Sequence, residues 1–112
     1  MFSIVNTRTG AVIASAASLL DSMREKGIGL IGAAAPRALV IHTRWGIHTF
    51  GVRFPIDAIV LDHAHIVRKI ATVAPNRFLF WDPDWGTVIE LPAGAAASGG
   101  VVLGDRIDFV VQ

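Results

Sequence analysis

The stretch IDAIVLDHAHIVRKIATV, residues 56–73, decides the fold predicted from this sequence. Its first six residues are almost continuously apolar and rich in β-branched side chains, which favours a buried strand. The letters DHAH at 62–65 are typical of a turn, and the chain returns through Ile66–Val73, where Arg68 and Lys69 interrupt the apolar run. The pattern predicts a hairpin with one buried and one half-exposed strand.

Further short β-compatible runs lie on both sides of this hairpin. Phe2–Val5 and Ala11–Ala14 flank a polar segment that ends in Gly10, which predicts another hairpin. Four more runs read as strands, at residues 38–41, 47–54, 87–91 and 107–111. Seven or eight short, mostly antiparallel strands indicate a mainly β domain, a small barrel or sandwich, rather than a wound α/β sheet.

One α-helix is expected near the N-terminus. Ser15 can cap a helix in which apolar residues recur at i, i+3, i+4 and i+7, and Gly27 can end it. The recurring residues are Ala16, Leu19, Leu20 and Met23. Only Ala95–Ser98 offers a second helical turn.

Length and composition favour one folded domain over residues 1–112. Hydrophobic residues make up 53% of the chain and charged residues 17%, the opposite of a disordered sequence. The ten Lys and Arg residues are scattered, with no cluster that could neutralise neighbouring phosphates, so nucleic-acid binding is not expected.

No transmembrane segment is expected, because the uncharged stretch 27–36 is short and interrupted by glycine and proline. The order of charged and apolar residues at the N-terminus is not that of a signal peptide, which predicts a cytoplasmic location for the chain as it stands.

No cofactor or metal is predicted. Residues 27–32 have the spacing GxGxxG, but a predicted helix precedes them where a dinucleotide-binding loop follows a strand. Cysteine is absent, which excludes thiolate nucleophiles and cysteine-ligated metals. His63 and His65 could share a strand face, yet they fall in the predicted turn without a further obvious ligand.

Polar residues interrupt apolar ones in the segment WGIHTFGVRFPID, residues 45–57. Asp57 begins the most apolar strand and Glu90 lies within another, where an unpaired carboxylate is costly. Arg53, His48 or a backbone turn could supply the partner that each carboxylate needs.

Two interpretations of these groups stay open. They pair with one another to pin loops, or they edge a small polar pocket walled by Trp45 and Phe50. In such a pocket Arg53 would hold an anion, because its planar guanidinium can pair with two oxygens.

A second candidate surface is the aromatic loop around Trp81 and Trp85, which follows Phe78 and Phe80. Aromatic side chains displayed on a loop can stack on sugars or anchor a partner, and they can also fold back as a lid on the core.

The sequence also resembles a known family. The runs IHTFGVRFPIDAIVLD at 47–62 and VIELPAG at 88–94, with the GD pair at 104–105 before an apolar strand, resemble the family catalogued as domain of unknown function 192. The resemblance covers nearly the whole chain, including the predicted helix that leads to residues 26–30 and Gly32 after it, and implies a compact, mainly β fold with one helix. Val52 departs from the methionine usual at its position, and Ala58 and Val60 from the usual strand residues.

The family has no established activity, and some members are encoded near bacterial pilus-assembly components, which suggests association with the cell envelope. Matched onto this sequence, its motif covers His48, Thr49, Arg53, Asp57, Asp62, Glu90, Gly94, Gly104 and Asp105. The resemblance therefore adds Thr49 and Asp105 to the candidate ligand-binding residues.

Together these observations predict a non-catalytic binding or accessory domain for an unknown small molecule or protein. One alternative is a small hydrolase that uses Asp57 or Glu90 as general base with His48. Another is a structural subunit of an envelope assembly with an exposed apolar patch around Trp81 and Trp85.

Overall fold

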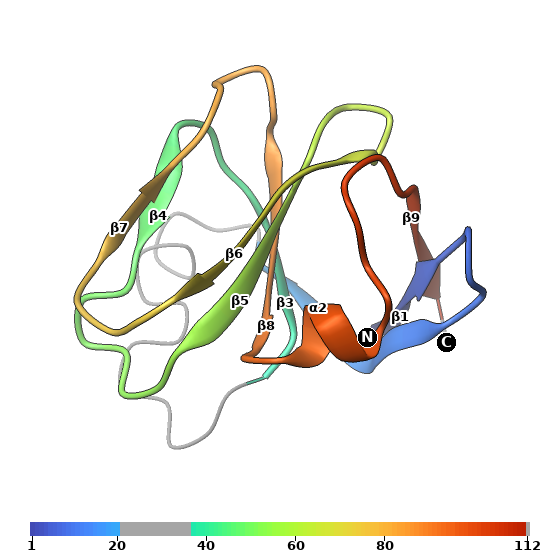
Figure 1. The fold of residues 1–112 in the computed structure, drawn as a ribbon, viewed down its shortest axis with the longest axis horizontal. Helices are drawn as coiled ribbons and strands as arrows, with labels where there is room; N and C mark the ends of the chain where they lie inside the picture. The colour runs from blue at the N-terminus through green and yellow to red at the C-terminus, as the bar shows by residue number, and fades with distance from the viewer. Residues whose placement is uncertain (21–36, 112) are drawn as a thin grey trace.

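A computed structural model describes residues 1–20 and 37–111 of the chain (Figure 1). These residues form nine strands and one short helix. In chain order they are β1 (Phe2–Asn6), β2 (Val12–Leu20), β3 (Leu39–His42), β4 (Gly46–His48), β5 (Ile56–Leu61), β6 (Val67–Val73), β7 (Phe78–Phe80), β8 (Thr87–Pro92), α2 (Ala95–Ser98) and β9 (Ile107–Val111). The mainly β class predicted from the sequence is confirmed.

Seven strands form one sheet in the order β6-β5-β8-β3-β2-β1-β9, in which only the β2–β3 pair is parallel. The sheet curls into a half-barrel whose two edge strands meet at one end. Ile66 and Arg106 form a bridge there, the Val67 amide donates to the Asp105 carbonyl (2.8 Å), and the Ile107 amide donates to the His65 carbonyl (2.9 Å). This junction ties the last strand to the predicted central hairpin.

Strands β4 and β7 form a separate two-stranded ribbon, which Figure 1 shows beside β5 and β6, on the side away from β1 and β9. Its inward side chains, Ile47 and Leu79, pack on one face of the large sheet. Helix α2 lies against the other face, where Ala96 joins the core inside the curl.

Strand β5 is buried on both sides. Ile59 and Leu61 belong to the core inside the curl, while Ile56, Ala58 and Val60 belong to the core under the β4–β7 ribbon. A strand covered on both faces needs a continuous apolar sequence, which explains the composition of residues 56–61. The predicted hairpin is confirmed, with β6 half-exposed.

The helix predicted to begin at Ser15 is wrong over the residues that the structure describes. Strand β2 continues to Leu20, where Ala17 pairs with Phe2 on one side and Ser18 pairs with Leu39 on the other. Backbone pairing with two neighbouring strands outweighs the weak local preference of this Ala- and Ser-rich segment for a helix. The rest of the predicted helix, and the glycine-rich residues 27–32, lie outside the described residues.

The helix that is observed, α2, lies near the C-terminus at the minor candidate Ala95–Ser98. Within residues 1–20 and 37–111, no helix is long and apolar enough to cross a membrane.

The strand expected over residues 47–54 is also shorter than predicted. Strand β4 ends at His48, after which the Val52 amide donates to the Thr49 carbonyl (3.1 Å) and Gly51 has a φ of 82°. The chain therefore turns at residues 49–52 instead of extending to Pro55. Gly51 supplies the positive φ that a turn of this kind uses.

Candidate functional site

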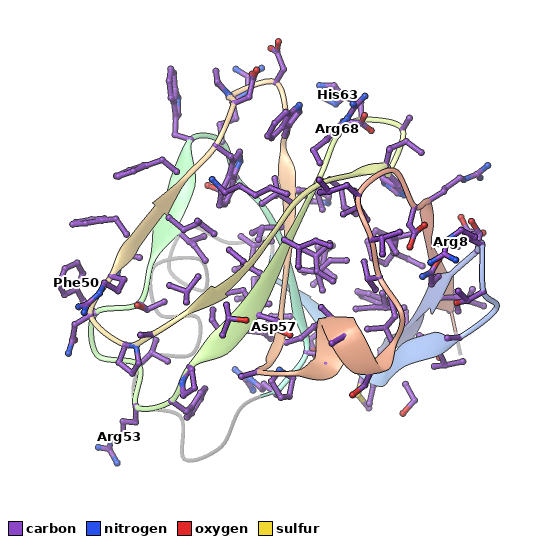
Figure 2. All side chains as sticks on the ribbon, in the orientation of Figure 1. Arg8, Phe50, Arg53, Asp57, His63 and Arg68 are labelled. Carbon is purple, nitrogen blue, oxygen red and sulfur yellow. The ribbon has the colours of Figure 1, made fainter. Side chains whose placement is uncertain are left out.

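Asp57 is buried and fully engaged within the fold. Its Oδ1 accepts a hydrogen bond from the Thr72 hydroxyl (2.7 Å), and its Oδ2 accepts from the backbone amides of Gly94 (2.9 Å) and Ala96 (3.1 Å). The amides at the start of a helix have no partner within the helix, and Asp57 satisfies two amides at this end. Figure 2 shows Asp57 beside α2. This carboxylate joins β5, β6 and α2.

Glu90 is also buried, but its carboxyl group is not fully hydrogen-bonded as that of Asp57 is. It pairs with Ala58 on one side and Leu39 on the other, and both belong to the core under the β4–β7 ribbon. Within the described part of the chain, its Oε2 has no hydrogen-bond partner. Burial raises the pKa of Glu90 to about 7, so this carboxyl is substantially protonated at neutral pH.

Asp105 holds the loop before β9 against the β1–β2 turn. It accepts hydrogen bonds from Arg8 Nε (2.6 Å), Asn6 Nδ2 (3.0 Å) and the Val102 amide (2.9 Å). The hydrogen bond from Arg8 is the main reason that the pKa of Asp105 is lowered to about 2. Asn6 and Arg8 were not singled out from the sequence, because nearly a hundred residues separate them from Asp105.

The four residues of the predicted polar pocket are not brought together. Asp57 and Glu90 point to opposite faces of the sheet, and His48 and Arg53 are both exposed. In Figure 2, Arg53 projects away from the body of the molecule, while Asp57 lies inside it near α2. Asp57 does not fit the other interpretation either, in which these groups pair with one another, because its partners are Thr72 and the backbone amides of Gly94 and Ala96.

The structure instead gathers aromatic side chains on the outer face of the β4–β7 ribbon. We call this surface the aromatic face and define it as His48, Phe50, Phe78 and Phe80 together with the exposed Trp45, which directly precedes β4. The exposed fractions are 65% for Trp45, 43% for Phe50, 61% for Phe78 and 65% for Phe80, and His48 is exposed too. Phe78 and Phe80 point outward because side chains alternate along a strand and Leu79 between them points into the core.

Four rings of the aromatic face, those of His48, Phe50, Phe78 and Phe80, contact one another. Phe50 packs edge-on against Phe78 with ring centroids 5.0 Å apart, Phe78 and Phe80 are nearly parallel at 5.6 Å, and His48 lies 5.8 Å from Phe50. Figure 2 shows Phe50 at the outer edge of the molecule. Exposed apolar side chains are ordinary when they are scattered singly, whereas a contiguous patch marks an interaction site.

Gly46 and Thr49 hold this ribbon in place. A Cβ atom at Gly46 would collide with the Leu79 carbonyl oxygen and press on the ring of Phe80, so only glycine fits under that ring. Thr49 is fully buried: its hydroxyl donates to the Ala74 carbonyl (2.7 Å) and accepts from the Arg77 amide (2.9 Å). Thr49, a candidate ligand-binding residue from the sequence, thus joins the end of β4 to the start of β7.

Trp81 and Trp85 do not form an exposed aromatic loop. Trp81 is buried, its indole Nε1 donates to the Trp85 carbonyl (2.8 Å), and both rings pack on the core under the ribbon. Trp81 and Trp85 therefore fold back as a lid on the core, which was one of the two interpretations of this loop. The neighbouring Phe78 and Phe80 carry the exposed surface, and the short apolar run of residues 78–80 was the available signal for a strand.

Other parts of the described chain offer little chemistry. A shallow groove of about 410 Å³ beside α2 is lined by uncharged residues, at 11–13, 92–95, 98 and 99. No group of three or more metal-ligating side chains occurs in the ranges that the structure covers. His63 is exposed, and the ring of His65 packs against Phe109 at 5.0 Å.

Two crystal structures share this fold. A protein of unknown function from Novosphingobium aromaticivorans DSM 12444 matches with a TM-score of 0.80 and 19% identity, over 96% of this chain and 82% of that chain. A protein from Sinorhizobium meliloti 1021, provisionally called a transcription regulator, matches with a TM-score of 0.82 and 16% identity, over 96% and 91%. At these identities the likeness establishes a common fold alone.

No protein-family model and no curated protein matches this sequence. The resemblance to domain of unknown function 192 stays a prediction from the residues.

Proposed function

We propose that this protein is a non-catalytic binding domain that attaches to its partner through the aromatic face. The observation that carries this proposal is the contact between exposed rings on the ribbon, from Phe50 through Phe78 to Phe80. Aromatic side chains bury a large apolar area at low cost in conformational entropy, and they dominate the energetics of many interfaces.

The rigid attachment of the ribbon supports the same role. Ile47 and Leu79 anchor it to the core, and Thr49 cross-links its two strands, so the exposed rings are held in place before binding. A surface that is ordered in advance loses less entropy when it binds.

The hydrolase alternative has less support. A general base must reach the reacting proton together with its partner groups, whereas Asp57 is engaged by three donors and Glu90 faces the opposite side of the sheet. His48 lies on the exposed ribbon, and its Nδ1 accepts the Phe50 amide (3.2 Å), which leaves the imidazole without a carboxylate among the described residues.

We also propose that the domain associates with the cell envelope, as the family resemblance suggests. The exposed patch that this idea requires is then the aromatic face, rather than Trp81 and Trp85. The provisional name of the Sinorhizobium meliloti protein also supports a role exercised through a partner.

A photo-reactive amino acid placed at Phe80 in native cells tests the binding role. We expect crosslinked products that disappear when Trp45→Ser is added, and none when the same group replaces Leu103, an equally exposed residue near the Asp105 loop. Equal products at both positions, or none at Phe80, would overturn the proposal.

A further inference from the structure

We infer that the partner of the aromatic face is the surface of an anionic phospholipid membrane. This inference rests on the binding role proposed above and names the chemistry that the surface would meet. Two features of the described residues lead to it: the phenylalanine rings of the aromatic face have no polar groups, and nearby cations have no acidic partners.

The three phenylalanines of the aromatic face are pure hydrocarbon side chains. They have no donor or acceptor with which to recognise a specific partner, and they show 43% to 65% of their surface to water. A bilayer accepts such rings at the boundary between headgroups and acyl chains without requiring matched hydrogen bonds. Trp45 at one end of the face suits the interfacial region, where tryptophan is enriched.

Cations without ion pairs occur next to these aromatic residues in the chain or contact their strand. Arg44 directly precedes Trp45, Arg77 directly precedes Phe78, and Lys69 Nζ donates to the Phe80 carbonyl (3.1 Å). Within the described residues, none of these three has an acidic side chain within 4.0 Å.

Three cations elsewhere on the described surface do form ion pairs: Arg8 with Asp105, Arg68 with Asp62, and Arg106 with Asp108. Two more cations of the described chain lack such a pair, Arg37 before β3 and Arg53. In Figure 2, Arg53 projects from the lower edge of the molecule, whereas Phe50 lies at the left edge. Lys69 and Arg77 donate to backbone carbonyls, but no acidic side chain of the described residues neutralises these cations, so their charge can attract anionic headgroups.

The acidic residues near the ribbon predict how the domain is oriented. Asp82 and Asp84 lie in the turn after β7, where Asp82 Oδ1 accepts the Asp84 amide (2.9 Å), and this turn adjoins Trp45 because the Trp81 amide donates to the Trp45 carbonyl (2.8 Å). Carboxylates are repelled by an anionic surface. The end of the ribbon with Phe50 and Phe78 therefore enters the membrane more deeply than the end with Trp45.

Sedimentation of the full chain with lipid vesicles tests the inference. We expect binding to vesicles that contain phosphatidylglycerol and phosphatidylcholine, weaker binding to phosphatidylcholine alone, and loss of binding as salt is raised. The double variant Phe78→Ser/Phe80→Ser should weaken binding at least about tenfold. Arg77→Gln should weaken it about fivefold on anionic vesicles only.

Two controls keep the test independent of folding. Leu103→Ser removes an equally exposed apolar side chain far from the ribbon and should leave vesicle binding unchanged. A blue shift of tryptophan emission on vesicle binding, absent in Trp45→Phe, would show that the aromatic face itself enters the lipid. Each variant is compared only if its thermal unfolding remains cooperative.

Absence of vesicle binding, or equal binding by Phe78→Ser/Phe80→Ser and wild type, would overturn the inference. Binding of a single-stranded oligonucleotide that depends on Phe78 and Phe80, without vesicle binding, would assign the face to nucleic acid instead. Concentration-dependent dimers that the double variant abolishes, again without vesicle binding, would assign it to a second copy of the chain. If crosslinking at Phe80 in cells persists while vesicle binding fails, only the lipid assignment falls; if both fail, the binding role falls too.

Discussion

Asp57 and Glu90 lie on adjacent strands, one step out of register, and their carboxylates point to opposite faces of one sheet. Asp57 pairs across from Leu91 and faces α2, whereas Glu90 pairs across from Ala58 and faces the core under the β4–β7 ribbon. Because side chains alternate along a strand, a difference of one residue separates the two groups completely. They therefore have different partners and different effects on stability.

Replacing Asp57 with alanine should destabilise the fold by about 2–4 kcal/mol, because the Gly94 and Ala96 amides and the Thr72 hydroxyl lose their acceptor. Urea unfolding measures the change. Asp84→Ala, at an exposed turn, is the matched control and should change the free energy of unfolding by less than about 0.5 kcal/mol. Equal effects of the two substitutions would contradict the assigned role of Asp57.

Glu90 should make the protein less stable as pH rises. Its pKa in the folded state is about 7, raised by burial from 4.5, so the folded chain holds this proton to a higher pH than the unfolded chain does. The free energy of unfolding should therefore fall between about pH 4.5 and 7, by on the order of 3 kcal/mol. Urea titrations across this range measure the slope, and Glu90→Gln should remove this contribution. A slope that Glu90→Gln leaves unchanged would mean that another group is responsible.

Asp105 should have the opposite pH dependence. Its pKa is lowered to about 2 from 3.8, chiefly by the hydrogen bond from Arg8, so its stabilising effect is complete above pH 3.8 and is lost as pH falls towards 2. Asp105→Asn should cost about 1–3 kcal/mol at neutral pH and reduce this acid-induced loss. Arg106→Gln, which removes an exposed pair 3.6 Å long, should have almost no effect on chemical unfolding. An Arg106→Gln effect as large as that of Asp105→Asn would show that burial does not distinguish the two pairs.

Gly46→Ala should displace the aromatic face. The added methyl group collides with the Leu79 carbonyl and the Phe80 ring, so β4 and β7 must separate, at a cost of about 1–3 kcal/mol. Thermal unfolding gives the loss, and vesicle sedimentation reports the effect on the surface. Gly86→Ala is the matched control, because a Cβ there meets nothing within 4 Å. Full vesicle binding by Gly46→Ala would contradict the link between this glycine and the face.

The central hairpin could be predicted from residues 56–73 because its determinants are local. A strand covered on both faces must be apolar throughout, and its return strand follows after a short polar turn, so neither feature depends on distant residues. The segment Ala16–Leu20 could not be predicted in this way. Its alanine and leucine residues favour a helix locally, and the strand results from pairing with β1 and β3 on either side of it.

The candidate site also has a part that could be predicted from the sequence and a part that could not. The residues alone establish that carboxylates within apolar strands are costly. The hydrogen bonds of Asp57 meet that requirement, whereas burial of Glu90, whose Oε2 has no partner among the described residues, raises its pKa to about 7. Which face each carboxylate occupies depends on strand register, and the grouping of Phe50 with Phe78 and Phe80 depends on the pairing of β4 with β7. Composition and local pattern thus specify strands and the need for partners, whereas long-range backbone pairing selects the partners and decides which side chains reach the surface together.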